Sequence, residues 1–282
     1  MSRRGRAIAL YIGVAYGLTW LIWWPYLRAA RSGSAPPGPF IYYLAALGPF
    51  VGALLAERYE RGWTGVSDLC RRLVDWHRPG WWLVVGVGSP LLLIPFAVGP
   101  GYALTGAWPA WDLVGVSGRA PGLGPVWTWL LMTASYGIGE EVGWRGFLLP
   151  RLQSNHSALR STLLLTVIWG AWHLPAFGFR EGYVGLGVVG VVGFLIGLAA
   201  GAVVLTSLYN AARGSILAVA LWHGTWNWVA TSDAFGGTWV AIMTGIIMAA
   251  APLVVLAWGA QDLAPSRRSM VPSADPSPTG GR

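Results

Sequence analysis

The sequence has little charge for its length and no lysine at all. Charged residues make up 11% of the 282 positions, hydrophobic residues make up 55%, and all 19 basic residues are arginine. A typical soluble domain carries about 25% charged residues, so a soluble globular protein is the wrong starting interpretation. A chain that crosses a membrane several times is the class that fits this composition.

Cysteine is almost absent as well. The single Cys70 cannot form a disulfide within the chain, and the sequence holds no cysteine cluster of the kind that binds a metal. The net charge of +8 does not indicate a nucleic-acid partner, because the arginines are spread between apolar runs and form no continuous patch. We expect membrane lipid, and no nucleic acid, as a partner.

Long apolar runs are what the sequence has in place of charge. A membrane-spanning helix needs about 20 apolar residues. Eight runs approach this requirement, at about 7–27, 38–56, 81–104, 124–139, 161–178, 184–208, 215–231 and 238–259, and the fourth is expected to continue as helix to about Gln153. We predict an all-α, polytopic membrane protein with about eight transmembrane helices, formed by residues 1–263 as a single domain.

The arginines between the runs predict the orientation in the membrane. Alternating loops place most of them on one side, namely Arg3, Arg4, Arg6, Arg58, Arg61, Arg71, Arg72, Arg78, Arg151, Arg160, Arg213, Arg267, Arg268 and Arg282. The other side receives Arg28, Arg31, Arg119 and Arg180. The positive-inside rule therefore predicts cytoplasmic termini. The arginine-only basic set and the 40 glycines suggest a GC-rich bacterial genome, and hence the plasma membrane of a bacterium.

Two segments outside the runs receive separate predictions. The stretch GVSDLCRRLVDWHRPGWW, residues 65–82, repeats apolar residues at helical spacing and offers Arg71, Arg72 and Arg78 to lipid headgroups. It is interpreted as a helix lying in the cytoplasmic interface. Residues 264–282 contain few large apolar residues and are predicted to be a disordered cytoplasmic tail.

Two adjacent glutamates, Glu140 and Glu141, fall inside a predicted membrane helix, whereas the other nine acidic residues are expected in loops, interfacial segments or tails. A carboxylate at mid-membrane costs roughly 3 kcal/mol, so its default interpretation is functional. Glu141 and Arg145 are four residues apart and are interpreted as a structural ion pair. Glu140 is left as the candidate catalytic carboxylate, facing a cavity.

Two histidines lie inside apolar helices, His173 in VIWGAWHLPAF and His223 in LAVALWHGTWNWVA. One such histidine is usually a packing residue, but two on separate helices together with a lone glutamate on a third favour a site. Asn227 follows His223 by four residues and projects from the same helix face. The predicted catalytic set is therefore Glu140, His173, His223 and Asn227.

This set is typical of hydrolysis by an activated water. The carboxylate can take a proton from water as a general base, and a histidine can share that proton or orient the water. The second imidazole and the amide can stabilise the oxyanion that develops on a peptide carbonyl. No serine or cysteine lies beside a candidate base in the sequence, so direct water attack is favoured over an acyl-enzyme.

A glutamate and two histidines are also the ligand set of a hydrolytic zinc site. The His-Glu-x-x-His helix that usually accompanies such a site is absent from the sequence. Zinc held by Glu140, His173 and His223 from three helices stays open as an alternative, and activity that survives exhaustive chelation would exclude it.

Three motifs in this order resemble the type II CAAX prenyl endopeptidases and their bacterial relatives, the CPBP intramembrane proteases. Glu-Glu-x-x-x-Arg matches residues 140–145, Phe-x-x-x-His matches at His173 with Trp169 in the aromatic position, and His-x-x-x-Asn matches residues 223–227. The resemblance covers about residues 125–230. It implies eight helical spans and a membrane-immersed site opening toward the cytoplasm, where Glu140 and His173 activate water and His223 and Asn227 hold the oxyanion.

We therefore expect an intramembrane endopeptidase that cleaves membrane-associated proteins or peptides. Bacterial relatives act in bacteriocin maturation, self-immunity and other peptide processing, so a membrane-anchored or hydrophobic peptide is a better expectation than a prenylated protein. Two alternatives remain. A proton-coupled transporter would also use intramembrane glutamate and histidine, and a non-catalytic membrane immunity or scaffold protein could retain the fold.

Overall fold

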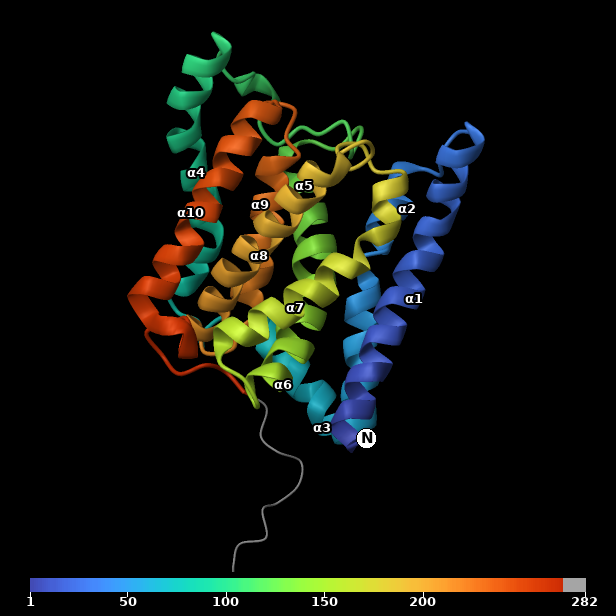
Figure 1. Ribbon diagram of the computed structural model, residues 1–282, viewed down its shortest axis with the longest axis vertical. Coiled ribbons are helices and arrows are strands. Elements are labelled where there is room, and N and C mark those ends of the chain that lie inside the picture. The colour runs from blue at the N-terminus through green and yellow to red at the C-terminus, as the bar shows by residue number, and fades with distance from the viewer. Residues whose placement is uncertain (271–282) are drawn as a thin grey trace, which may run out of the picture.

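The computed structural model describes residues 1–270 and shows a bundle of helices, with no strand in this part of the chain (Figure 1). The α-helices are α1 (Arg3–Ser32), α2 (Pro39–Leu44), α3 (Leu47–Val74), α4 (Trp82–Thr105), α5 (Pro125–Met132), α6 (Leu149–Gln153), α7 (Ala158–Trp172), α8 (Gly187–Ala211), α9 (Ile216–Ala230) and α10 (Gly237–Asp262). Between α5 and α6 the chain is wound as two π-helices, η2 (Thr133–Glu140) and η3 (Val142–Leu148). Short 3-10 helices are η1 (Trp111–Leu113) and η4 (Leu174–Gly178).

All eight predicted apolar runs contain helix. Five helical segments of the described chain are long and apolar enough to cross a membrane: Arg3–Ser32, Pro39–Val74, Trp82–Thr105, Gly187–Ala211 and Gly237–Asp262. The protein is thus an all-helical, multi-pass membrane protein, as predicted from the sequence. The count of eight spans stays a prediction.

Helix α9 lies inside the bundle and packs against η2, α4, α5 and α8, while α1 and α3 pack together along one side (Figure 1). Glycine allows α9 and η2 to approach closely. A Cβ added to Gly224 on α9 would lie 2.5 Å from the Thr133 Cα, and one added to Gly137 on η2 would overlap the Ala220 carbonyl. Small residues at such contacts let membrane helices pack backbone to backbone. This close approach brings the middle of α9 to the glutamate pair.

The π-helical winding of residues 133–148 was not predicted, although the helix does continue through the glutamates to Gln153. A π-helix is wider than an α-helix, is rare, and frequently occurs at functional sites. Two arginines bond carbonyls near its end. Arg72 Nη2 donates to the Gly146 carbonyl at 3.0 Å, and Arg151 Nη1 donates to the Phe147 carbonyl at 2.8 Å.

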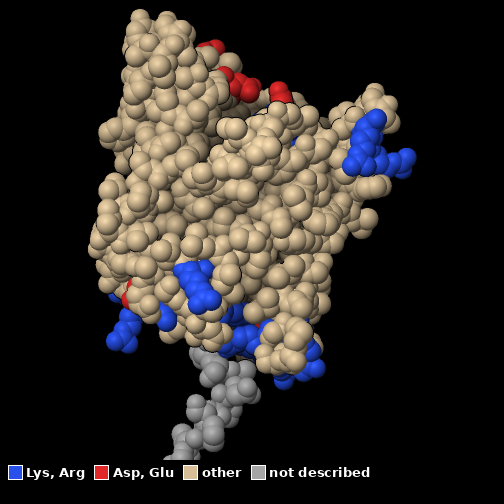
Figure 2. Space-filling view, viewed as in Figure 1, with Lys and Arg blue, Asp and Glu red and all other residues tan. Residues whose placement is uncertain are grey.

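Arginines gather at one end of the bundle, the lower end in Figure 2, where the N-terminus lies in Figure 1. The acidic residues visible on this face concentrate at the opposite end. A second arginine patch lies near the end of α1, whose last turn carries Arg31. The arginine asymmetry used to predict topology is therefore an asymmetry between the two ends of the folded bundle.

Two expectations about polar residues are wrong. Glu57 and Glu60 do not lie in a loop, because α3 extends through them and buries both carboxylates. Arg72 is not available to lipid headgroups. Its Nε bonds Asp68 at 3.1 Å and its Nη1 donates to the Tyr209 hydroxyl at 3.0 Å, inside the protein. The sequence showed that these residues are polar but did not indicate which distant residues they contact.

Of the predicted interfacial helix at residues 65–82, residues 65–74 form the end of α3, and Gly62 (φ 71°, ψ −156°) kinks α3 just before them. Only glycine adopts this backbone conformation readily. The location of the segment in the cytoplasmic interface stays a prediction. Of the predicted disordered tail, residues 264–270 are instead held against the bundle, since Ser269 accepts a hydrogen bond from Gln153 Nε2 at 2.6 Å. Residues 271–282 lie outside the described part.

Candidate active site

One cavity of about 410 Å³ holds all four predicted catalytic side chains. Glu140 from η2, His173 from the end of α7, and His223 and Asn227 from α9 line it together. Helices α8 and α10 supply the facing wall. The four side chains come from three separate segments, and the fold gives them a common space.

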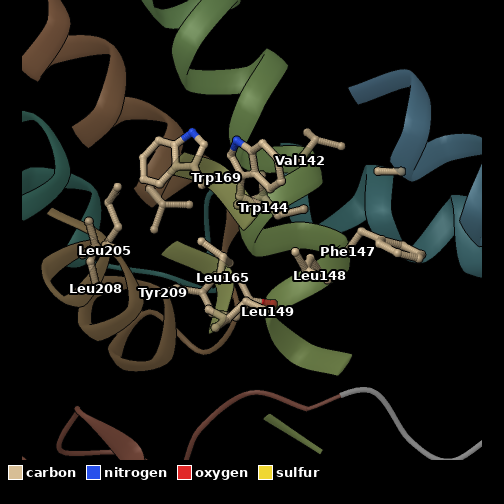
Figure 3. Packing of buried hydrophobic residues seen from close by; sticks show 14 of the residues in the cluster. Val142, Trp144, Phe147, Leu148, Leu149, Leu165, Trp169, Leu205, Leu208 and Tyr209 are labelled. Atoms are coloured by element: carbon tan, nitrogen blue, oxygen red, sulfur yellow. The ribbon is translucent and has the colours of Figure 1, made fainter. Parts of the chain in front are cut away.

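Glu140 is the central carboxylate of this cavity and is 2% exposed. Its Oε2 accepts two hydrogen bonds, from Trp169 Nε1 at 2.8 Å and from Trp144 Nε1 at 3.2 Å. Figure 3 shows the two indoles side by side with their nitrogens on the same side. Oε1 has no hydrogen-bond partner among the described residues. The two indoles therefore fix one oxygen and leave the other for a ligand in the cavity.

Trp169 occupies the position where the family motif has phenylalanine, and the structure gives a reason for the substitution. Its indole nitrogen supplies an N–H that phenylalanine lacks, and this N–H bonds Glu140. The ring also lies under a cation, because the Arg145 guanidinium carbon is 4.6 Å from its centroid. Trp169 and Glu140 are 29 residues apart, so the motif around Trp169 did not indicate this hydrogen bond.

Glu141 has a second partner that the sequence did not indicate. Its Oε1 bonds Arg145 Nη1 at 2.8 Å, and the same oxygen lies 2.7 Å from His223 Nδ1. Because a carboxylate oxygen accepts hydrogen bonds, His223 Nδ1 carries the proton here. Glu141 thus bonds an arginine on its own helix and also orients the imidazole of α9 so that Nε2 is left for the cavity.

His173 is oriented by the backbone of its own helix. Its Nδ1 lies 2.8 Å from the Trp169 carbonyl oxygen, an atom that can only accept, so Nδ1 carries a proton. In the neutral ring Nε2 then carries a lone pair. The ring packs against the aromatic rings of Trp172 and Phe194, with centroids 4.8 and 5.4 Å away. These contacts limit its rotation.

Asn227 lies one turn beyond His223 on α9, as its spacing predicted, and lines the same cavity. Its Nδ2 donates to the His223 carbonyl at 3.1 Å. A carboxamide nitrogen carries two hydrogens, so the second N–H is left for a ligand.

A metal does not fit the site as it is arranged. Within residues 1–270, no group of three or more His, Cys, Asp or Glu side chains is placed to hold an ion. The three zinc ligands considered, Glu140, His173 and His223, are not gathered into such a group.

A second cavity, of about 530 Å³, adjoins the first and was not foreseen from the sequence. It shares Arg119, Tyr136, Arg180 and Glu181 with the first cavity. The rest of its wall is largely aromatic or proline, including Tyr26, Tyr42, Phe179, Pro36 and Pro37. The residues that line this second cavity come from segments far apart in the chain, so no single sequence motif predicts it.

Of the shared charged residues, Arg119 and Glu181 are exposed, so the first cavity meets the surface at its mouth there, in connections at the end opposite the N-terminus (Figure 1). Two expectations from the sequence therefore conflict. Cytoplasmic termini and a site that opens toward the cytoplasm cannot both hold, because the N-terminus and the mouth lie at opposite ends of the bundle.

Comparison with known proteins identifies the segment that carries the site. Residues 122–229 match the family described as type II CAAX prenyl endopeptidase Rce1-like. A stretch of 59 residues is 36% identical to CAAX prenyl protease 2 of Methanococcus maripaludis, and covers 21% of this chain and 21% of that protein. The four cavity residues all fall within the family match. Residues 122–229 are therefore similar to the Rce1-like type II CAAX prenyl endopeptidases, which confirms the resemblance inferred from the motifs.

Proposed function

We propose that the protein is an intramembrane endopeptidase that hydrolyses peptide bonds of membrane-anchored or hydrophobic peptides with a water molecule activated by Glu140 and His173. The observation that carries the proposal is how the two carboxylate oxygens of Glu140 are bonded. One of its oxygens is held by two indoles, and the other is free in a cavity that also contains both histidines.

The proposed reaction begins with water beside the free oxygen of Glu140. Glu140 takes one proton from this water, and His173 Nε2 accepts a hydrogen bond from the other O–H and orients the attack. The water oxygen bonds to the peptide carbonyl carbon. The oxyanion that forms accepts hydrogen bonds from the Asn227 amide N–H and from His223 at Nε2, the ring nitrogen that does not bond Glu141. Glu140 then passes its proton to the leaving nitrogen as the C–N bond breaks.

The cavity wall favours water over a side-chain nucleophile. No serine or cysteine lines the described cavity, and the two threonines that do are bonded to their own helices. Thr231 Oγ1 donates to the Asn227 carbonyl at 2.7 Å, and Thr244 Oγ1 donates to the Val240 carbonyl at 2.8 Å. Cys70 does not line the cavity.

The test in cells is a comparison of membrane peptidomes by mass spectrometry. Cells carrying the parental protein should contain peptide products that are missing from cells carrying Glu140→Gln, which keeps the shape of the side chain but removes its basicity. Asp112→Asn is the matched control, because it makes the same chemical change at an exposed position outside the cavity. Identical peptidomes for parental protein and Glu140→Gln would contradict the proposal.

Removal of metal separates the zinc alternative from the proposed mechanism. Purified protein treated exhaustively with EDTA and 1,10-phenanthroline should cleave its substrate at the untreated rate, since no step needs an ion. Loss of activity that returns on addition of zinc would overturn the metal-free mechanism and would restore the ligand set of Glu140, His173 and His223.

A further inference from the structure

The exposed residues that line the catalytic cavity, Arg119, Glu181, Gly182 and Gly193, lie toward one end of the bundle. Its charged lining residues, Arg119, Arg180 and Glu181, belong to two connections, from α4 to α5 and from η4 to α8. Both connections lie at the upper end in Figure 1. Thr231, which also lines the cavity, directly follows the upper end of α9. No residue of the α6–α7 or α8–α9 connections, at the lower end, lines the cavity.

The charged residues at the mouth indicate that it meets water and not lipid. Ionisable side chains in membrane proteins face water-filled cavities or the interface, because their transfer into hydrocarbon is costly. The described residues supply no ion-pair or hydrogen-bond partner for the Arg180 guanidinium, which lies 4.8 Å from the Tyr183 ring centroid and 5.5 Å from that of Tyr42. Stacking on ring faces leaves its in-plane N–H groups for water or a substrate.

The opposite end of the bundle carries the arginines that determine topology. Arg3, Arg58, Arg71, Arg160 and Arg213 belong to the N-terminus, the lower part of α3, the start of α7 and the α8–α9 connection. Figure 2 shows blue residues gathered at this lower end and a separate, smaller blue patch at the upper end near the end of α1. Arginine in short loops is retained on the cytoplasmic side, and acidic residues contribute little to this rule. The arginine-rich end is therefore the cytoplasmic end.

We propose that the cavity faces away from the cytoplasm, so that the protein takes its substrates from the extracytoplasmic side of the membrane. The substrate class is then the membrane-proximal stretch of peptides or proteins whose chain is exposed outside the cytoplasm. The substrate part rests on the proposed function. The orientation rests only on the arginines and on the end where the cavity opens. It resolves the conflict between the two sequence expectations in favour of cytoplasmic termini.

Two cysteine reporters test the orientation without any need for activity. The native Cys70 is exposed and lies at the arginine-rich end. Asp112→Cys in a Cys70→Ala background places a thiol at an exposed position on the mouth side, outside the cavity wall. In intact spheroplasts, a membrane-impermeant maleimide should label Asp112→Cys and should label Cys70 only after permeabilisation. The reverse pattern would overturn the proposed orientation.

A second arm tests where cleavage occurs, in sealed vesicles of known orientation. An internally quenched, membrane-impermeant peptide that the detergent-solubilised protein cleaves is added outside right-side-out and inverted vesicles. We expect cleavage by right-side-out vesicles and its loss in inverted vesicles until detergent is added. Cleavage confined to inverted vesicles, or equal in both while maleimide protection shows them sealed, would overturn extracytoplasmic uptake. Failure to find any peptide that the solubilised protein cleaves would contradict the proposed function, and the cysteine reporters would still decide the orientation.

Discussion

Two clusters of buried carboxylates lie on the same helical bundle, and they differ in how their charge is balanced. At the arginine-rich end, Glu57 and Glu60 share Arg151, whose Nη2 and Nε lie 3.0 and 2.7 Å from their respective oxygens. Arg61 also bonds Glu57 at 2.8 Å, and Arg4 lies 3.4 Å from Glu60. Every carboxylate in this cluster therefore has more than one cationic neighbour.

In the catalytic cavity the balance is incomplete. Glu141 has Arg145 and His223, but Glu140 has only two neutral indole N–H donors within hydrogen-bond distance. Buried charges are expensive unless they are paired, so an unpaired carboxylate persists only where something other than stability retains it. Burial alone therefore does not distinguish the proposed general base from the other buried carboxylates. Glu140 differs from them in lining the cavity without a cation within hydrogen-bond distance.

Glu141→Gln should give the largest effect, on both stability and turnover. Glu141 is paired with the buried Arg145 and also bonds His223, which lines the cavity. Arg145 would be left buried without its carboxylate, which costs about 3–5 kcal/mol of unfolding free energy. His223 would also lose the partner that orients it, so turnover per folded molecule should fall. Unfolding in detergent and kcat of the folded fraction measure the two effects. A variant that loses stability but keeps its kcat would show that His223 does not depend on Glu141.

Arg151→Met is the matched change in the other cluster. It leaves two carboxylates with fewer cations, so we expect a loss of about 3–5 kcal/mol of unfolding free energy. Because Arg151 does not line the catalytic cavity, kcat of the folded fraction should equal that of the parental protein. Unfolding curves and initial rates on the same preparation provide the measurement. A selective fall in kcat would mean that the two clusters are coupled.

Trp169→Phe should give a smaller effect, confined to catalysis. It restores the aromatic residue of the family motif and removes one N–H from Glu140. A hydrogen bond to a charged group contributes about 1.5–3 kcal/mol, so kcat should fall by roughly 10-fold to 100-fold. KM should change little, since the indole bonds the carboxylate and not the substrate. An increase in KM at constant kcat would instead place Trp169 in substrate binding.

The helices and the site residues could be predicted from the sequence to different extents. Long apolar runs mark helices because the bilayer selects for length and hydropathy, and each run contains helix in the structure. Rare polar residues in those runs drew attention to Glu140, His173 and His223 for the same reason. All three line one cavity.

What the sequence did not reveal are contacts between distant segments. The bond from Glu141 to His223 spans 82 residues, and the bond from Arg151 to Glu60 spans 91. Neither changes the local periodicity on which a prediction depends. The π-helical winding of residues 133–148 is likewise a property of the packed bundle, because close contact with α9 and donors from Arg72 and Arg151 are formed only in the fold.

In the proposed mechanism Glu140 activates water and does not stabilise the fold. Purified parental protein and Glu140→Gln should therefore be compared in the same detergent, for kcat on one cleavable peptide and for thermal unfolding. We expect kcat to fall by about 10³-fold or more, within the range that general-base catalysis supplies, while the unfolding temperature stays close to the parental value. Cleavage by Glu140→Gln at the parental rate would contradict this mechanism.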